Sequence, residues 1–431
     1  DVPFNVKAND TSEGARDPMP QIPSETILSF LINDLENCKD DGMTDYGNDV
    51  YNTSRITKNA IYALLADLYL WRAAKNSCPD SAAKYPGQSQ RDYQRVIELC
   101  DVVIADKLHE FQKEKEYYYG STDPSKMPLP IYQPTSFGRI QDLPYQELFG
   151  RKGSLESIFE IAFDGSRNIN SLVTSFYGGL DGGTHQSGLV GGSSIYQEVD
   201  LRPDMAQSVY CQTDLRAVES IMYQTNTTSS SNDYRVIKYV AQEVEVLDGS
   251  NVRKAATSAS AANVNYSGIR STSSCDANWI IYRVSDVILM KAEAIACSCE
   301  EGDPLLEEAF NLTNAVLDRS NPMMESKYRL KYTSYSTPTA LYDFVMRERQ
   351  REFFAEGKRW FDLVRMAMRD NSTQNMLNLL VAKYASNSSA IKAKLATMNS
   401  LFSPVLKDEM KVNPALVQNP AWIVDEDIVR N

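Results

Sequence analysis

Histidine, cysteine and long apolar runs are all scarce in this sequence. Its 431 residues include only two histidines, His109 and His185, and seven cysteines. No Cys/His spacing typical of a zinc site occurs, and the scattered cysteines exclude a scaffold built on disulfides. The most apolar helical candidate, residues 279–296, is interrupted by Arg283 and Asp286, and no apolar run reaches the roughly 18 residues that a membrane-spanning helix needs. We therefore expect neither a metal site nor a membrane span.

Basic residues are outnumbered by acidic ones. The chain carries 44 Lys and Arg against 57 Asp and Glu, a formal net charge of −13. Binding to nucleic acid and attachment through a polybasic membrane patch both need an excess of Lys and Arg, so both are excluded. Tyrosine, by contrast, is abundant, with 24 Tyr against 14 Phe and 4 Trp. Rings with a polar tip suit a hydrated recognition surface.

Apolar periodicity predicts a mainly α fold. In two of the expected helices the small residues Ala66 and Ala292 lie at the centre, as in the helix pairs of tetratricopeptide repeats. Residues 157–163 alternate β-branched and aromatic side chains and predict a short strand. The segments between the helices, among them the glycine-rich residues 178–192, are expected to be long loops. The expected helices span residues 24–37, 55–74, 91–105, 278–297, 305–317 and 341–368.

Catalytic motifs are not found. The sequence has neither a GxxxxGK[ST] phosphate loop nor a GxSxG nucleophile elbow, and any Ser-His-Asp arrangement would depend on His109 or His185. A capping role is expected for His109, which follows a helix, whereas His185 lies in the glycine-rich loop and is the better candidate for a ligand contact. No calcium loop of the form D-x-[DN]-x-[DN]-G is present. We expect no catalytic residue, no metal and no cofactor.

Residues 344–365 are the most distinctive stretch. Opposite charges recur three residues apart, as on one face of a helix, and Gly357 would let the chain bend. One interpretation makes Arg359 an anion clamp and Trp360 a platform for a sugar. The interpretation that we favour is a semi-buried ion network that fixes how helices dock. The four expected pairs are Glu348–Arg351, Arg349–Glu352, Glu356–Arg359 and Asp362–Arg365.

This stretch resembles the signature of the SusD/RagB family, the cell-surface ligand-binding lipoproteins of Bacteroidetes. The family pattern ER-x-x-E…EG-x-RW-x-DL-x-R is matched by Glu348, Arg349, Glu352, Glu356, Gly357, Arg359, Trp360, Asp362, Leu363 and Arg365. Further segments agree in order along nearly the whole chain, at residues 55–70, 156–161, 214–216, 237–239, 282–294 and 418–422. Two departures stand out. Val2-Pro3-Phe4 is similar to a point inside the family's N-terminal region, and Ala421 replaces the glycine of the closing QNPGW motif.

The resemblance implies a tetratricopeptide-like helical core with long irregular loops and a few short strands. Residues 1–145 would be the remainder of the family's N-terminal helical region and residues 146–431 its C-terminal region, packed as one globular unit. Such proteins are non-catalytic. They bind a nutrient at the extracellular face of the outer membrane and deliver it to a SusC-like TonB-dependent transporter. Their membrane attachment is a lipid anchor, and we expect this anchor to lie outside this sequence.

The expected ligand contacts lie in the variable loops. Aromatic faces stack on sugar rings, while polar side chains bond to hydroxyl groups. The predicted ligand-binding residues are Tyr177, His185, Tyr196 and Trp279. A glycan is the leading ligand, and capture of peptides by a RagB-type protein is the alternative. A glycan hydrolase and a helical adaptor that binds only proteins are rivals from other functional classes.

Overall fold

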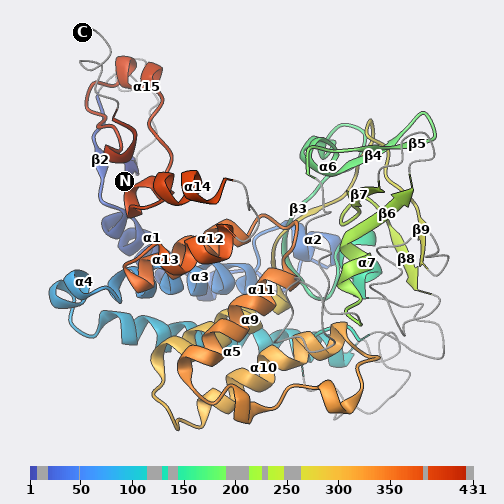
Figure 1. The fold of residues 1–431 in the computed structure, drawn as a ribbon, viewed down its shortest axis with the longest axis horizontal. Coiled ribbons are helices and arrows are strands. Elements are labelled where there is room, and N and C mark those ends of the chain that lie inside the picture. Colours follow the sequence, from blue (N-terminus) through green and yellow to red (C-terminus); the bar gives the residue numbers. More distant parts are fainter. Residues whose placement is uncertain are drawn as a thin grey trace. The chain divides into compact units, whose positions relative to one another are not determined.

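The computed structural model (Figure 1) describes residues 1–6, 18–47, 49–113, 129–133, 144–190, 213–225, 232–246, 264–381 and 387–423. The chain divides into two compact units. The first comprises Asp1–Cys38, Leu68–Asp92 and Trp360–Asn431, and the second comprises Lys39–Asp67 and Tyr93–Arg359. Two long helices, α3 (Lys58–Asn76) and α5 (Gln88–Lys113), contribute residues to both units. The division that we expect at residue 145 stays a prediction.

The first unit gathers both ends of the described chain. Arg72 in α3 donates from Nε and Nη2 to the two oxygens of Asp92 in α5, each at 2.8 Å, a bidentate pair that joins these helices. The Asn413 side chain accepts from the backbone N–H of Met19 at 3.1 Å and donates to its carbonyl at 2.8 Å, so the two terminal segments are bonded. Besides parts of α3 and α5, this unit contains β1 (Val2–Pro3), β2 (Gln21–Ile22), α1 (Ser24–Cys38), α4 (Pro79–Lys84), α12 (Arg359–Asp370), α13 (Gln374–Val381), α14 (Ser388–Lys394), η9 (Met398–Leu401), α15 (Lys407–Val412) and η10 (Pro420–Trp422).

The second unit is organised around α9 (Val284–Ser298), which packs against α10 (Leu305–Ser320) and α11 (Pro338–Glu352) (Figure 1). Every residue of α9 from Val284 to Ala296 is buried, as expected of a helix surrounded by protein on all sides. Its charges are paired: Lys291 contacts Asp101 of α5 and Glu308 of α10. The other helical segments here are η2 (Lys39–Asp41), α2 (Asp49–Ser54), η4 (Gln146–Gly150), α6 (Ser171–Tyr177), α7 (Arg216–Ser220), η7 (Ser326–Tyr328) and η8 (Tyr332–Ser334).

The strands of the second unit form antiparallel pairs. They are β3 (Ser157–Ile161) with β10 (Trp279–Arg283), β4 (Gly178–Asp181) with β5 (Thr184–Ser187), β6 (Ile221–Thr225) with β7 (Asn232–Val236), and β8 (Glu243–Val246) with β9 (Val264–Ser267). A hydrophobic core lies among these hairpins and includes Phe149, Tyr239 and Ile280. The prediction of a mainly α fold with a few short strands is confirmed.

Several predicted boundaries are wrong. The helix predicted over residues 91–105 is longer, since α5 extends to Lys113, and His109 therefore lies within this helix and does not follow it. Residues 279–283 form β10 rather than the start of a helix, because their β-branched and aromatic side chains pair with β3. The helix predicted over residues 341–368 is interrupted between α11 and α12, where Ala355 and Gly357 adopt the positive φ angles of 60° and 78°. Part of the glycine-rich segment is the β4–β5 hairpin, in which Gly182 and Gly183 supply the positive φ that a tight turn needs.

Among the described residues, no helix is both long and apolar enough to cross a membrane.

Candidate ligand-binding site

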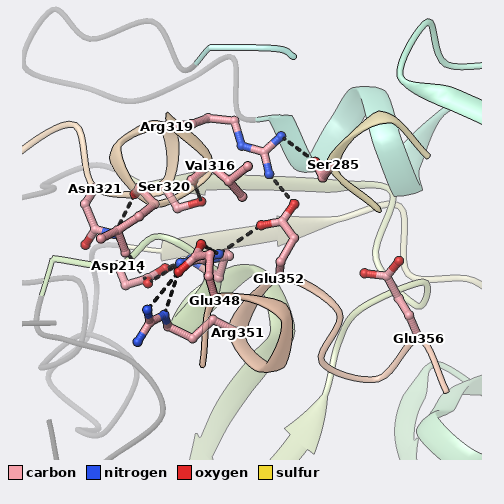
Figure 2. Close-up of polar contacts among 12 residues, drawn as sticks. Asp214, Ser285, Val316, Arg319, Ser320, Asn321, Glu348, Arg351, Glu352 and Glu356 are labelled. Atoms are coloured by element: carbon pink, nitrogen blue, oxygen red, sulfur yellow. Dashed lines mark hydrogen bonds and ion pairs between the residues drawn. The ribbon is translucent and has the colours of Figure 1, made fainter. Parts of the chain in front are cut away.

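Charged side chains from several elements meet in the interior of the second unit (Figure 2). Two of the carboxylates come from α11, while the guanidinium groups come from α7, β10, α10 and α11. None of the side chains is more than 6% exposed. We call this set the ion cluster; its cations are Arg216, Lys238, Arg283, Arg319 and Arg351, and its anions are Glu156, Asp214, Glu348, Glu352 and Glu356.

Glu352 lies at the centre of the ion cluster. It accepts hydrogen bonds from Arg216 at 2.9 Å and from Arg283 at 2.6 Å, and it also pairs with Arg319. Burial alone would raise the pKa of Glu352, but the three guanidinium groups hold it well below its usual range. One ionised carboxylate thus joins α7, β10 and α10 to the end of α11.

Two of the four expected i,i+3 pairs are seen among the described residues. Glu348 pairs with Arg351 at 2.8 Å, and within α12 Asp362 pairs with Arg365 at 2.8 Å. The remaining carboxylates have partners from elsewhere in the chain, because α11 ends at Glu352 and the turn after it points Glu356 toward other elements. Glu356 accepts from Lys238 at 2.6 Å and from Arg283 at 3.0 Å. The interpretation as an ion network is confirmed, and the network is fully buried rather than semi-buried.

Two of the predicted ligand-binding residues contact the turn at residues 353–357. Tyr177 ends α6, is 8% exposed, and donates its hydroxyl to the carbonyl oxygen of Ala355 at 2.7 Å. Its burial raises the pKa of the Tyr177 hydroxyl. Trp279 begins β10 and is partly exposed. A Cβ built on Gly357 would lie 3.6 Å from the Trp279 ring. The structure therefore brings Tyr177 and Trp279 to the same turn.

The other two predicted residues are less fully described. His185 lies in β5, opposite Leu180 of β4, in the hairpin that directly follows Tyr177. Tyr196 lies outside the described residues. The roles of all four residues in ligand binding stay predictions.

The sequence did not single out two aromatic residues that support Trp279. Tyr239 stacks on the Trp279 ring with 5.1 Å between centroids and 14° between planes, and Phe149 meets Tyr239 edge-on at 4.9 Å. Tyr239 is fully buried and adopts φ 69°, a conformation that non-glycine residues rarely adopt. Tyr239 belongs to the 237–239 segment of the family resemblance, which pointed to the scaffold rather than to a ring stack.

Exposed apolar side chains mark the same part of the second unit. Phe176, beside Tyr177 in α6, is 44% exposed, and Leu172 one turn earlier is 63% exposed. Leu189 and Val190 donate backbone hydrogen bonds to the carbonyls of Ser175 and Phe176, so the segment that follows β5 is bonded to α6. Together with Trp279, this region offers aromatic surface to solvent.

One cleft in the described part of the second unit is close to the size of a small ligand site. This cleft, of about 210 Å³, lies between η8 and α11 and is lined by Tyr335, Phe344 and Arg351, among others. Pockets for drug-sized molecules span roughly 300–1,000 Å³. The residues that the structure describes include no group of three or more His, Cys, Asp or Glu placed to hold a metal ion.

Comparisons with solved structures identify the fold. A SusD superfamily protein from Parabacteroides distasonis matches with a TM-score of 0.57 and 19% identity, covering 98% of this chain and 74% of that one. Surface glycan-binding protein A from Bacteroides uniformis matches with a TM-score of 0.52 and 19% identity, covering 97% of this chain and 73% of that one. At such identities the likeness establishes the fold alone.

Sequence comparison establishes the family. A SusD-like protein from Formosa agariphila is 38% identical over 91 residues, which are 21% of this chain and only 17% of that protein. The model of the SusD family matches residues 156–422. That match covers well over half of the sequence and contains the whole ion cluster, and the chain therefore belongs to the SusD family.

Proposed function

We propose that this protein captures a nutrient glycan at the cell surface and delivers it to a SusC-like TonB-dependent transporter. Membership of the SusD family carries the proposal, because proteins of this family are generally non-catalytic binding proteins. One structural relative, from Bacteroides uniformis, is named as a surface glycan-binding protein. The proposal includes a location at the extracellular face of the outer membrane, with attachment through a lipid anchor, and binding without chemical change of the ligand.

The aromatic surface around Trp279 is the proposed contact region. The Trp279 ring is supported from within by Tyr239, at 5.1 Å between centroids, so its orientation is fixed before a ligand arrives. A rigid ring loses little conformational entropy on binding and can stack on the C–H face of a sugar. Phe176, which is 44% exposed, and the β4–β5 hairpin that carries His185 belong to the same unit as Trp279.

Affinity electrophoresis against plant, host and microbial polysaccharides tests the proposal. We expect retarded migration in at least one polysaccharide, followed by a smaller retardation for Trp279→Leu, which keeps an apolar side chain but removes the ring. Trp279→Phe keeps a ring and should retain part of the affinity. Trp360→Ala is a matched control and should bind like the wild type, since Trp360 is 40% exposed and lies in the first turn of α12, away from the proposed contact residues in the sequence.

Three other results would contradict the proposal, and each would favour a different function. Binding to a peptide library without binding to any polysaccharide would favour the RagB-type alternative. Release of shorter sugars on prolonged incubation would indicate a hydrolase. Recovery of protein partners without a SusC-like transporter would favour a helical adaptor.

A further inference from the structure

A small cavity lies beside α7, at the edge of the ion cluster. Its volume is about 20 Å³, which is enough for one water molecule. Polar groups on its wall include Ser220, Lys238 and Arg283, together with Glu219 of α7. The cavity therefore combines room for a water molecule with the polar partners that a buried water requires.

Glu219 differs from the carboxylates of the ion cluster. Only 9% of Glu219 is exposed, and its Oε1 atom is buried without a hydrogen-bond partner among the described residues. The oxygens of Glu352 and Glu356, by contrast, are bonded to Arg and Lys side chains. An ionised carboxylate that is buried without such a partner carries a large desolvation penalty, which protonation relieves.

The cations near Glu219 are already paired. Arg216, on the same helix, bonds to Asp214, Glu348 and Glu352. Arg319 of α10 bonds to Glu156 and Glu352. In the wall of the cavity, Lys238 and Arg283 both bond to Glu356.

The other titratable groups that face Glu219 give it no counter-charge. Asp214 and Glu352 are acidic and disfavour a further negative charge. The Tyr145 hydroxyl donates to the carbonyls of Ile237 and Ala241, and the Tyr266 hydroxyl donates to that of Val218. Neither hydroxyl donates to Glu219.

The charges of the ion cluster balance without Glu219. Among the described residues the cluster contains the five cations Arg216, Lys238, Arg283, Arg319 and Arg351, and the five anions Glu156, Asp214, Glu348, Glu352 and Glu356. An ionised Glu219 would add a sixth negative charge in the same low-dielectric interior. A neutral Glu219 would preserve the balance.

We propose that Glu219 is a buried proton-binding site, neutral in the folded protein and hydrogen-bonded to a single water molecule in the adjoining cavity. Burial raises the pKa of Glu219 from its ordinary value of 4.5 to about 7. The folded protein then binds a proton that the unfolded chain releases between about pH 4.5 and 7. The stabilisation of the folded state by this bound proton is fully present below pH 4.5 and is lost as the pH rises through 7.

The location of Glu219 gives its ionisation a structural consequence. Helix α7 is followed directly by β6, which pairs with β7 from Ile221–Val236 to Thr225–Asn232. Ionisation of Glu219 would place an unbalanced charge two residues before β6, the first strand of this hairpin. We expect the β6–β7 hairpin to be less stable against local opening above pH 7 than below it.

Thermal unfolding of the wild type and Glu219→Gln between pH 5 and 8.5 tests the proposal. The glutamine side chain is neutral at every pH. The melting temperature of Glu219→Gln, relative to that of the wild type, should therefore increase by about 5 °C as the pH rises through this range. Glu300→Gln, at an exposed position, is the matched control and should follow the wild type. A difference between wild type and Glu219→Gln that does not change with pH would overturn the proposal.

A second measurement does not depend on whether Glu219→Gln folds. Calorimetric unfolding of the wild type at pH 6, in buffers of different ionisation enthalpy, counts the protons released on unfolding. We expect Glu219 to contribute close to one proton, which Glu219→Met should not release. Equal proton release by the wild type and Glu219→Met would also overturn the proposal. Neither measurement involves a glycan, so their outcomes are independent of the proposed function.

Discussion

Arg283 donates from Nη1 to Oε1 of Glu352 at a distance of 2.6 Å, although 69 residues separate them in the sequence. Arg283 ends β10 and directly precedes α9, and Glu352 ends α11. The Arg283 guanidinium also lies 4.7 Å from the centroid of the Phe353 ring, which adds a cation–π contact. This pair thus fixes the beginning of the central helix α9 to the end of α11.

Replacement of Glu352 by glutamine is expected to destabilise the second unit strongly. The amide is neutral and would leave Arg216, Arg283 and Arg319 buried with one shared counter-charge fewer. Breaking a buried ion pair from one side costs about 3–5 kcal/mol. Chemical denaturation of Glu352→Gln, monitored by circular dichroism, measures the loss.

The control for this experiment is an exposed ion pair. Asp408 and Lys411 in α15 are paired at 2.7 Å, but their side chains are 77% and 76% exposed. Asp408→Asn should leave stability unchanged within error, since solvent screens such pairs. A loss in Glu352→Gln no larger than that in Asp408→Asn would contradict the structural role of the ion cluster.

Asp286 of α9 should make stability depend on pH in the acid range. Its carboxylate bonds to Arg349 at 3.0 Å and to Lys358. Burial alone would raise the pKa of Asp286, but Lys358 and Arg349 lower it from 3.8 to about 2. Because the folded pKa is depressed, this stabilisation is present above pH 3.8 and is lost as the pH falls through 2, in total about 2 kcal/mol.

Asp286→Asn isolates this effect. The variant should be less stable than the wild type near neutral pH, and the difference in unfolding free energy should narrow by about 2 kcal/mol as the pH falls from 5 toward 2. Urea denaturation at several pH values measures it. A difference that stays constant over this range would show that Asp286 titrates normally.

The sequence predicted local relationships better than distant ones. Glu348 and Arg351 lie three residues apart on one helix, so their pairing follows from helical geometry alone. Two of the partners of Glu352, Arg216 and Arg283, are 136 and 69 residues away. No local rule specifies contacts at such separations, because they depend on how the elements pack.

The same limit applies to the candidate site. Tyr177 was expected in a ligand-binding loop and Trp279 at the start of a helix, whereas Tyr177 ends helix α6 and Trp279 begins strand β10. Their meeting at the turn around Ala355 depends on the positive φ of that residue and of Gly357. Spacing in the sequence predicted a bend at Gly357 but not which side chains the bend would contact.

Tyr177→Phe separates the structural role of the hydroxyl from a role in binding. The substitution removes the hydrogen bond to the carbonyl of Ala355 and should lower the unfolding free energy by about 1 kcal/mol. Because the hydroxyl is already bonded within the protein, we expect ligand affinity to change by less than about twofold. Affinity electrophoresis and thermal unfolding of the same preparation provide both readouts. Lost affinity at unchanged stability would instead support a direct contact between the hydroxyl and the ligand.

Opposite substitutions in the turn after α11 should change stability in opposite directions. Gly357 adopts φ 78°, where a side chain is strained, and a Cβ there would meet only the Trp279 ring, at 3.6 Å. Gly357→Ala should therefore cost about 1–2 kcal/mol from backbone strain rather than from a clash. Ala355 already adopts φ 60°, so Ala355→Gly relieves the same strain.

Both net changes should be smaller than the strain alone, because glycine increases and alanine decreases the entropy of the unfolded chain, by the equivalent of about 0.4–1 kcal/mol in each variant. The two variants are matched controls for one another, since each exchanges one methyl group within a single turn. Chemical denaturation of both variants measures whether each substitution raises or lowers the unfolding free energy. Since Tyr177 bonds to the carbonyl of Ala355, destabilisation by both variants would mean that the packing of the turn, and not its backbone conformation, sets the stability of this part of the unit.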